Sequence, residues 1–215
     1  YHYFYPRDVE WFTVGRQLEN IDAVKTRIMT HGAIGTCMYY HATYMQNFIH
    51  YQPPTAGEQP NHAIAIIGWD DTKVTQAPQP GAWLCKNSWG SGWGYGGYFW
   101  ISYYDKHACK QPEMGAVSFR DVELLDYSSV YYHDYHGWRA TLEGVTEAFN
   151  VFTMGGDEMV RSVSFYTASD SVDYTVRIYD TFDGAALVEE LAASSGTFER
   201  RGLHTVDLDV PVAFS

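Results

Sequence analysis

The spacing of apolar residues near the start of the chain predicts one short helix. Ile21, Val24 and Ile28 recur at the interval of a single helical face. Asn20 is placed to cap the first turn with its side chain, and Gly32 is placed to end the helix. The sequence therefore predicts a helix between these two residues.

The residues that follow alternate between apolar runs and segments rich in proline and glycine. We expect a buried strand within residues 32–40, a loop over residues 51–60 and a strand over residues 61–70. The last of these is almost wholly apolar, which indicates a strand covered on both faces. Two more strands, within residues 81–89 and 96–104, flank a glycine-rich turn.

The pattern changes near residue 126, where short alternating strands are separated by Gly, Asp, Ser and Thr. Strands at this spacing are typical of an antiparallel sandwich, so we predict two domains, residues 1–125 and residues 126–215. One segment, residues 186–194, has a helical composition. The strands expected in the second domain lie within residues 130–138, 147–154, 159–168, 173–181 and 204–214.

Composition excludes some classes of function. Hydrophobic residues make up 46% of the chain and aromatic residues 17%, which favours a packed, strand-rich globule. The formal net charge of −12 argues against a nucleic-acid partner, because binding to phosphates requires clustered Lys and Arg. No apolar run reaches the roughly 20 residues of a membrane span, so we expect no transmembrane segment.

A histidine at the head of a predicted strand is the strongest candidate for chemistry. His62 can act as a general base because the unperturbed pKa of histidine is about 6.5. Asn87 can fix its tautomer through a side-chain carbonyl, and Trp89 can shield that hydrogen bond from water. Glycines would let the backbone fold tightly around the neighbouring indoles; they are Gly90, Gly92, Gly94, Gly96 and Gly97.

The segments around these residues resemble the papain-like cysteine peptidases. NHAIAIIGWD, which contains His62, and WLCKNSWGSGWGYGGYFWIS, which contains Asn87, are similar to the histidine and asparagine segments of that family. The similarity spans roughly residues 20–125. It implies a two-lobed α+β fold, of which this chain carries the strand-rich part, and cleavage of a polypeptide substrate through an acyl-enzyme. In that resemblance His62 is the base, Asn87 orients it, and Trp89 shields the pair and lines the leaving-group side.

The sequence departs from this family at the nucleophile. It has no cysteine followed by the aromatic and helical segment that carries the family's nucleophile, and no upstream glutamine for the oxyanion hole. We therefore expect an internal fragment that is inactive alone, with the Cys and Gln supplied by a missing N-terminal lobe or by a separate light chain. Tyr95 and Gly96 occupy positions where the family usually has Glu and Asn. This departure concerns only the packing of the local turn.

The three cysteines are weak candidates for that nucleophile. In the resemblance, Cys37 lines the second substrate pocket together with Pro60 and Ala63, although a buried small apolar residue is the simpler interpretation. Cys85 is expected in a core strand. Cys109 lies in a predicted loop and is the only candidate for exposure. Three cysteines allow at most one disulfide between them.

The C-terminal segments, among them VRSVSFYTASDSVDYTVRIYD, resemble the lectin-like domain found behind bacterial and archaeal papain-like peptidases. This implies an antiparallel β-sandwich, truncated at Ser215, and an extracellular or cell-surface location. Its role would be to bind a substrate, a cell surface or a carbohydrate, or only to pack on the peptidase. The rival function for the protein is a non-catalytic papain-like scaffold that acts as a carbohydrate- or protein-binding module.

No segment calls for a metal or a cofactor, and we expect neither. His133, Asp134 and His136 are close in sequence but lack a distant fourth ligand, so a solvated loop is the better interpretation. Residues 179–184 resemble the start of a calcium loop but lack its later glutamate, and a hairpin turn is expected there.

Overall fold

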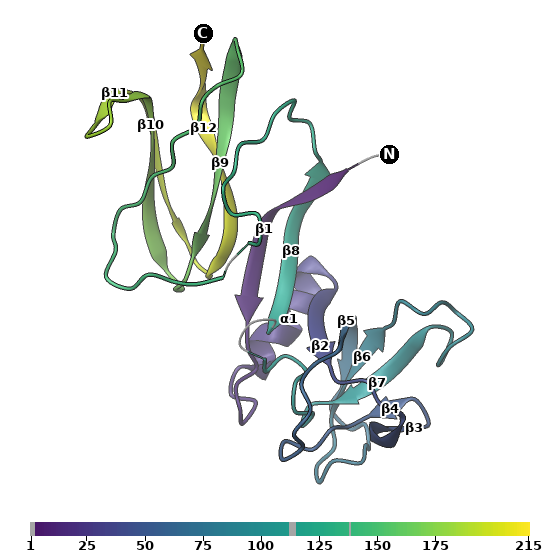
Figure 1. Cartoon of the computed structure of the whole chain (residues 1–215). Helices are drawn as coiled ribbons and strands as arrows, with labels where there is room; N and C mark the ends of the chain where they lie inside the picture. The colour runs from purple at the N-terminus through teal and green to yellow at the C-terminus, as the bar shows by residue number, and fades with distance from the viewer. Residues whose placement is uncertain (1–2, 112–114, 138) are drawn as a thin grey trace. The chain divides into compact units, whose positions relative to one another are not determined.

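The computed structural model describes residues 3–111, 115–137 and 139–215. Its elements are shown in Figure 1, and most of them are strands. In chain order they are β1 (Phe4–Phe12), α1 (Ile21–His31), β2 (Ile34–Met38), the 3₁₀ turn η1 (Ala42–Tyr44), β3 (Met45–Gln46), β4 (Ile49–His50), β5 (His62–Asp70), β6 (Ala82–Lys86), β7 (Tyr98–Ser102), β8 (Ala116–Leu124), β9 (Glu158–Thr167), β10 (Val172–Phe182), β11 (Leu187–Phe198) and β12 (Gly202–Phe214).

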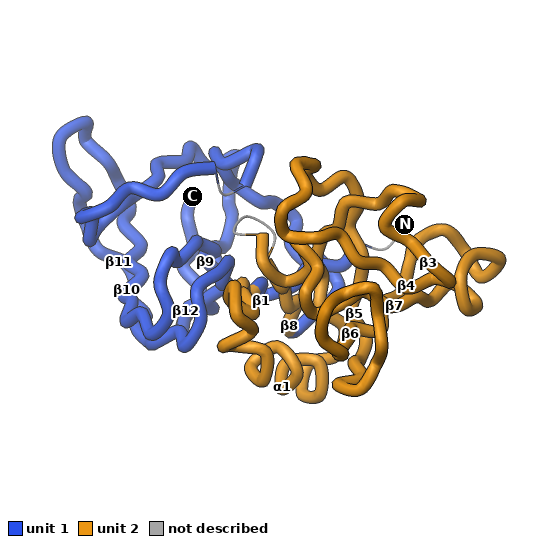
Figure 2. The backbone as a smooth tube through the Cα atoms, turned by 90° about the horizontal axis from the view of Figure 1, so that it is seen from below, with its two compact units in different colours: residues 1–9, 121–215 blue, residues 10–120 orange. Residues whose placement is uncertain are grey.

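The chain divides into two compact units, which Figure 2 shows in different colours. One unit comprises residues 10–120, and the other comprises residues 1–9 together with residues 121–215. Strands β1 and β8 contribute residues to both units. The units therefore have different bounds from the predicted domains, whose division after residue 125 stays a prediction.

The predicted helix is confirmed as α1, with Val24 and Ile28 buried. Gly32 follows it with a φ of 87°, in the left-handed region that glycine tolerates, and its N–H donates to the carbonyl of Ile28. The predicted side-chain cap is wrong. Asn20 has a φ of −112° and a ψ of 18°, which is not the extended conformation of a capping residue, and its side chain makes no capping hydrogen bond.

The sheet of the unit 10–120 has the strand order β3-β4-β7-β6-β5-β2-β8. The strand pairs β2–β5, β5–β6 and β6–β7 are antiparallel, whereas β4 and β7 are parallel. Trp83 of β6 and Phe99 and Ile101 of β7 are fully buried in the apolar core of this unit. The strands expected within residues 32–40, 61–70, 81–89 and 96–104 are thus confirmed as β2, β5, β6 and β7, and residues 51–60 form the expected loop.

One expectation for β5 is wrong. Ile64 and Ile66 are buried, but Ala63 is exposed and Ile67 is 37% exposed, so the strand is not covered on both faces. β5 pairs with a neighbour at each edge, and only one of its faces packs into the core. The uniformly apolar sequence of β5 therefore predicts more burial than the strand has.

The other unit contains the antiparallel strand pairs β9–β12 and β10–β11. Val176 of β10 packs in one apolar cluster with residues of β12, among them Val206 and Leu208. Two sheets that enclose a core in this way form a sandwich, as predicted. The turn expected in residues 179–184 is also confirmed, because the carboxylate of Asp183 accepts from two following backbone amides and Leu187 then begins β11.

Two expectations for this unit are wrong. The described residues within 130–138 and 147–154 contain no strand, and Trp138 lies outside the described residues. Residues 187–194 belong to β11 and pair along β10, so the segment with a helical composition is extended. Pairing with a partner strand overrides its intrinsic preference. No helix among the described residues has the length and hydropathy that a membrane span requires.

Candidate active site

Two paired strands bring His62 and Asn87 together. His62 is the first residue of β5, Asn87 follows the last residue of β6, and β5 and β6 are antiparallel neighbours. The imidazole Nε2 lies 2.8 Å from the side-chain oxygen of Asn87. Because that oxygen can only accept, Nε2 carries the proton and Nδ1 keeps the lone pair. The pair is therefore arranged to accept a proton at Nδ1.

Asn87 is held in this orientation by the protein around it. Only 6% of its surface is exposed, and its side-chain oxygen also accepts from the backbone N–H of Ser88 at 2.8 Å. The backbone N–H of Asn87 donates to the carbonyl of Gly97 at 2.9 Å. These contacts fix the amide before a substrate arrives, as expected for a residue that orients a base.

The indole of Trp89 lies over the imidazole. The ring centroids of Trp89 and His62 are 4.6 Å apart and the rings are inclined by 21°, a stacked arrangement. Tyr40 makes a T-shaped contact with the same indole, with ring centroids 4.5 Å apart. The structure thus brings together the three residues that the sequence predicted, and Trp89 covers one face of the histidine.

The glycines after Trp89 are required by the turn that follows. Gly94 has a φ of 62°, and a Cβ atom there would lie 2.4 Å from the carbonyl oxygen of Tyr98. Gly97 has a φ of 94° and supplies the carbonyl that accepts from Asn87. Gly92 has no positive φ, so the predicted need for glycine does not extend to every position.

The three predicted pocket residues lie near the same end of β5. Cys37 of β2 is paired in register with Ala63, and Met38 is paired with His62. Paired residues share a face of the sheet and successive residues alternate, so Cys37 and Ala63 lie on the face opposite to His62. Pro60 is half-buried in the loop before β5. This arrangement does not direct the thiol of Cys37 to the imidazole.

The other two cysteines are also unsuited to nucleophilic attack. Cys85 is buried in β6, as predicted, and burial raises its pKa. Cys109 is fully buried rather than exposed, which corrects the sequence-based expectation, and burial raises its pKa to about 12. Its backbone bonds to Val14 and to the hydroxyl of Thr36 tie this loop into the core. Because the thiolate is the reactive form, neither cysteine is activated.

A buried carboxylate that no local sequence pattern reveals lies shortly after the end of β7. Asp105 is fully buried, and one of its oxygens lies 3.2 Å from Nδ1 of His50, a histidine for which the sequence predicts no role. Its oxygens also accept from the backbone N–H groups of Gln52 at 2.8 Å, His107 at 2.9 Å and Ala108 at 3.1 Å. Burial acts to raise the pKa of Asp105, but these hydrogen bonds outweigh burial and hold the pKa below its usual value.

The segment that Asp105 organises holds the loop leading to His62. His107 Nε2 lies 2.9 Å from the carbonyl of Glu58, and the ammonium of Lys106 donates to the same carbonyl at 3.2 Å. Closer to the histidine, the side chain of Asn61 accepts from the N–H of Tyr40 at 2.7 Å. The loop is thereby anchored by several hydrogen bonds up to the residue before His62.

Comparison with known proteins decides the family. Residues 8–118, more than half of the chain, match the family described as papain family cysteine protease. The chain belongs to the papain family of cysteine proteases. Residues 130–215 match the family described as lectin like domain. The resemblances found in the sequence are confirmed, in the same order along the chain.

This papain-family chain is similar over nearly its full length to Cwp84, a clostridial cysteine protease. The structure of Cwp84 after propeptide cleavage is 26% identical with a TM-score of 0.73, and the match covers 96% of this chain and 52% of that one. The cysteine protease and lectin-like domains of Cwp84 from Clostridium difficile match with 22% identity, a TM-score of 0.67 and coverage of 96% and 46%. The predicted fold class is thereby confirmed.

A curated relative matches a shorter part of this papain-family chain. Cathepsin C of Schistosoma mansoni is 36% identical over 64 residues, which is 30% of this chain and 13% of the relative. The chain spans about half the length of the Cwp84 structures and a much smaller part of this cathepsin.

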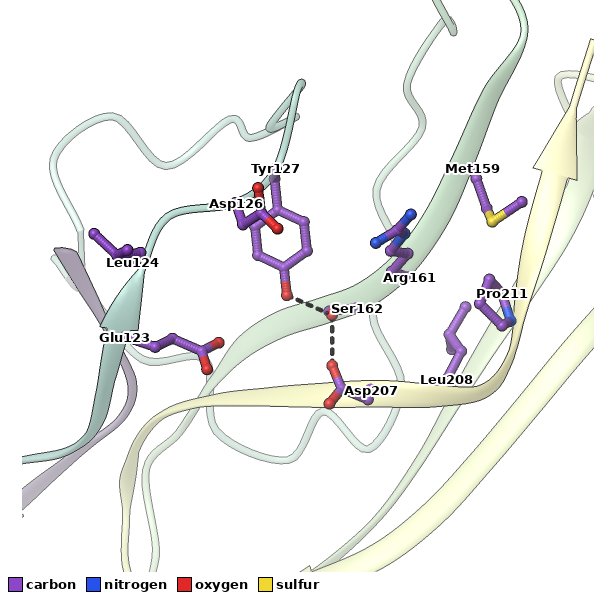
Figure 3. Close-up of a pocket in the computed structure, with 10 residues that line it drawn as sticks. All are labelled: Glu123, Leu124, Asp126, Tyr127, Met159, Arg161, Ser162, Asp207, Leu208 and Pro211. Atoms are coloured by element: carbon purple, nitrogen blue, oxygen red, sulfur yellow. Dashed lines mark hydrogen bonds between the residues drawn. The ribbon is translucent and has the colours of Figure 1, made fainter. Parts of the chain in front are cut away.

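The unit that contains the sandwich has a pocket, which is lined by residues C-terminal to the papain-family match. The pocket has a volume of about 470 Å³ and is shown in Figure 3. The hydroxyl of Tyr127 lies 2.8 Å from that of Ser162, which donates to Asp207 at 2.6 Å. The guanidinium of Arg7 pairs with Asp207 and Glu123. The lining residues are Glu123, Leu124, Asp126, Tyr127, Met159, Arg161, Ser162, Asp207, Leu208 and Pro211.

The lining thus combines carboxylates and hydroxyls with apolar side chains. The carbohydrate expected at the lectin-like domain stays a prediction. The predicted solvated loop contains His133, whose ring stacks on Phe152 with centroids 4.6 Å apart. Within the described part of the chain, no group of three or more His, Cys, Asp or Glu side chains could hold a metal ion.

Proposed function

We propose that this chain carries the histidine and asparagine of a cysteine endopeptidase. The observation that carries the proposal is the hydrogen bond of 2.8 Å between Nε2 of His62 and the side chain of Asn87, beneath the stacked indole of Trp89. It leaves Nδ1 as the basic nitrogen. A base of this kind, oriented by an amide and covered by an indole, is what activation of a thiol requires.

In the proposed reaction, Nδ1 of His62 takes the proton of a cysteine thiol, and the thiolate attacks the carbonyl carbon of a peptide bond. His62 then gives that proton to the leaving amine as the C–N bond breaks. A water molecule, deprotonated by His62, attacks the acyl-enzyme and releases the thiol and a carboxylic acid. Asn87 holds the imidazole in position and stabilises the imidazolium without taking a proton.

We infer that the nucleophile and the oxyanion glutamine come from residues outside this chain, on a missing lobe or on a separate light chain. The burial of Cys85 and Cys109, and the placement of Cys37 on the face opposite to His62, support this inference. This chain alone is therefore expected to hydrolyse nothing. A non-catalytic binding module is the alternative, but such a module has no chemical use for an intact arrangement of His62, Asn87 and Trp89.

We also propose that the protein acts outside the cytoplasm, at the cell surface or beyond it. Its support is the likeness to Cwp84, which is described as a surface layer associated protein. The lectin-like domain behind the peptidase part agrees with such a location.

The Cys-His-Asn arrangement is tested by Asn87→Ala in the full-length protein. A hydrogen bond to a charged group contributes about 1.5–3 kcal/mol, and each 1.36 kcal/mol or so is tenfold in rate, so we expect kcat/KM to fall about 10- to 100-fold. Ser88→Ala is the matched control, because only the backbone of Ser88 contacts the amide. Unchanged kinetics in the folded Asn87→Ala variant would show that the asparagine does not orient the base.

A further inference from the structure

A row of aromatic side chains leads away from the histidine across the surface of the unit 10–120. The centroid of Trp93 is 5.0 Å from that of Trp89, the centroid of Phe48 is 5.4 Å from that of Trp93, and the centroid of Tyr95 is 5.5 Å from that of Phe48. We call these four residues the aromatic ridge. The ridge begins at the indole that stacks on His62.

The outer part of the ridge is exposed. Phe48 is 36% exposed and Tyr95 is 55% exposed, and Trp89 at the inner end is 42% exposed. Single exposed apolar side chains are ordinary, but rings in mutual contact form a continuous apolar surface, and such surfaces mark binding sites. The continuity with His62 indicates that the occupant is a molecule bound at the catalytic histidine.

Phe48 lies in a turn whose backbone conformation is unfavourable for a bulky residue. Asn47 and Phe48 have φ values of 49° and 55° and form the two-residue turn between β3 and β4. A bulky residue rarely adopts this left-handed conformation, for which Asn-Gly is the preferred pair. The turn is fixed from both sides, since the hydroxyl of Tyr95 donates to the carbonyl of Asn47 and the N–H of Trp100 donates to the carbonyl of Phe48.

We propose that Phe48 and Tyr95 bind apolar side chains of the polypeptide substrate on the leaving-group side of the cleaved bond. This proposal rests on the proposed function of His62 and Asn87, and on the leaving-group side that the papain-family resemblance implies for Trp89. Neighbouring centroids along the ridge are about 5 Å apart, and an extended peptide advances about 3.3–3.6 Å per residue. Two such steps lead from Trp89 to Phe48 and three lead to Tyr95. If the first residue beyond the cleaved bond lies at Trp89, Phe48 and Tyr95 are thus within reach of roughly the second to sixth residues.

The test uses the full-length enzyme and two internally quenched peptides. The peptides are identical except that the residues from the second to about the sixth after the cleaved bond are Leu in one and Asp in the other. A coumarylamide substrate with no residue after the cleaved bond reports the chemistry alone. The variants are Phe48→Gly, which keeps the turn because it creates the preferred Asn-Gly pair, and Tyr95→Ser.

The controls separate the rings from other effects. Phe119→Ser is the control variant, because it removes an exposed ring of the same unit outside the ridge. We expect the wild-type enzyme to prefer the Leu peptide, and each ring deletion to lower kcat/KM for that peptide about tenfold. The ring deletions should change kcat/KM for the Asp peptide and for the coumarylamide little, and Phe119→Ser should change kcat/KM little for all three substrates.

The outcomes distinguish the two proposals. If the full-length wild-type enzyme hydrolyses none of the three substrates, the proposed peptidase function fails. If it hydrolyses them but does not prefer the Leu peptide, or if Phe48→Gly and Tyr95→Ser leave that preference unchanged, the assignment of the ridge is wrong while the peptidase function stands. Equal losses on the coumarylamide would also overturn the assignment, because that substrate has no residue that extends to Phe48 or Tyr95.

Discussion

Replacing His62 with alanine in the full-length protein is expected to lower kcat for peptide hydrolysis by at least about 10⁴-fold. The imidazole is the only group in the proposed site that accepts a proton, since Asn87 can hold it but cannot replace it. The thiol would remain protonated near neutral pH, and the leaving amine would receive no proton. Single-turnover kinetics on an internally quenched peptide would measure the loss.

His136→Ala is the matched control, because His136 is exposed and belongs to the other unit. It should hydrolyse the peptide at the wild-type rate. Asn87→Ala should lie between the two variants, because its loss misorients the base and does not remove it. Turnover by His62→Ala within tenfold of the wild type would refute the assignment of His62 as the base.

Replacing Asp105 with alanine is expected to destabilise the protein by about 3–5 kcal/mol, because it leaves His50 and three buried amides without their common acceptor. Urea denaturation at pH 7 would measure the change. Asp71 is a suitable comparison, since its side chain is exposed and its carboxylate pairs with Lys25. Asp71→Ala should cost about 1 kcal/mol or less.

The stabilisation by Asp105 should depend on pH in a defined direction. Its pKa in the folded protein lies below the unfolded value, so the unfolded chain binds the proton at a higher pH than the folded protein does. The contribution is therefore fully present above the unfolded pKa of about 3.9 and is lost as the pH falls through the folded pKa. A difference between the wild type and Asp105→Ala that is the same at pH 3 and pH 7 would contradict this account.

The parts of the site that could be predicted from the sequence are those with a local pattern. His62 heads an apolar run that becomes β5, and Asn87 ends another that becomes β6, so pairing of these strands brings both residues to one place. Trp89 follows Asn87 within two residues. The helix was also predictable, because apolar spacing and Gly32 are local signals.

The parts that could not be predicted depend on long-range contacts. Asp105 and His50 meet across the fold, and no local feature of either segment reveals that they are buried together. Cys109 looks like a loop cysteine, and only its contacts with Val14 and Thr36 explain its burial. Residues 187–194 are extended because β10 supplies a pairing partner, which their composition does not encode.

The central claim is that His62 serves a cysteine that lies outside residues 1–215. Labelling of the full-length protein with an epoxysuccinyl inhibitor, followed by mass spectrometry of its peptides, tests it most directly. We predict one rapidly labelled cysteine outside this chain, with labelling strongly slowed by His62→Ala. Labelling of Cys37, Cys85 or Cys109, or labelling that proceeds at the wild-type rate without His62, would contradict the claim, and a folded protein that takes up no label would favour the non-catalytic alternative.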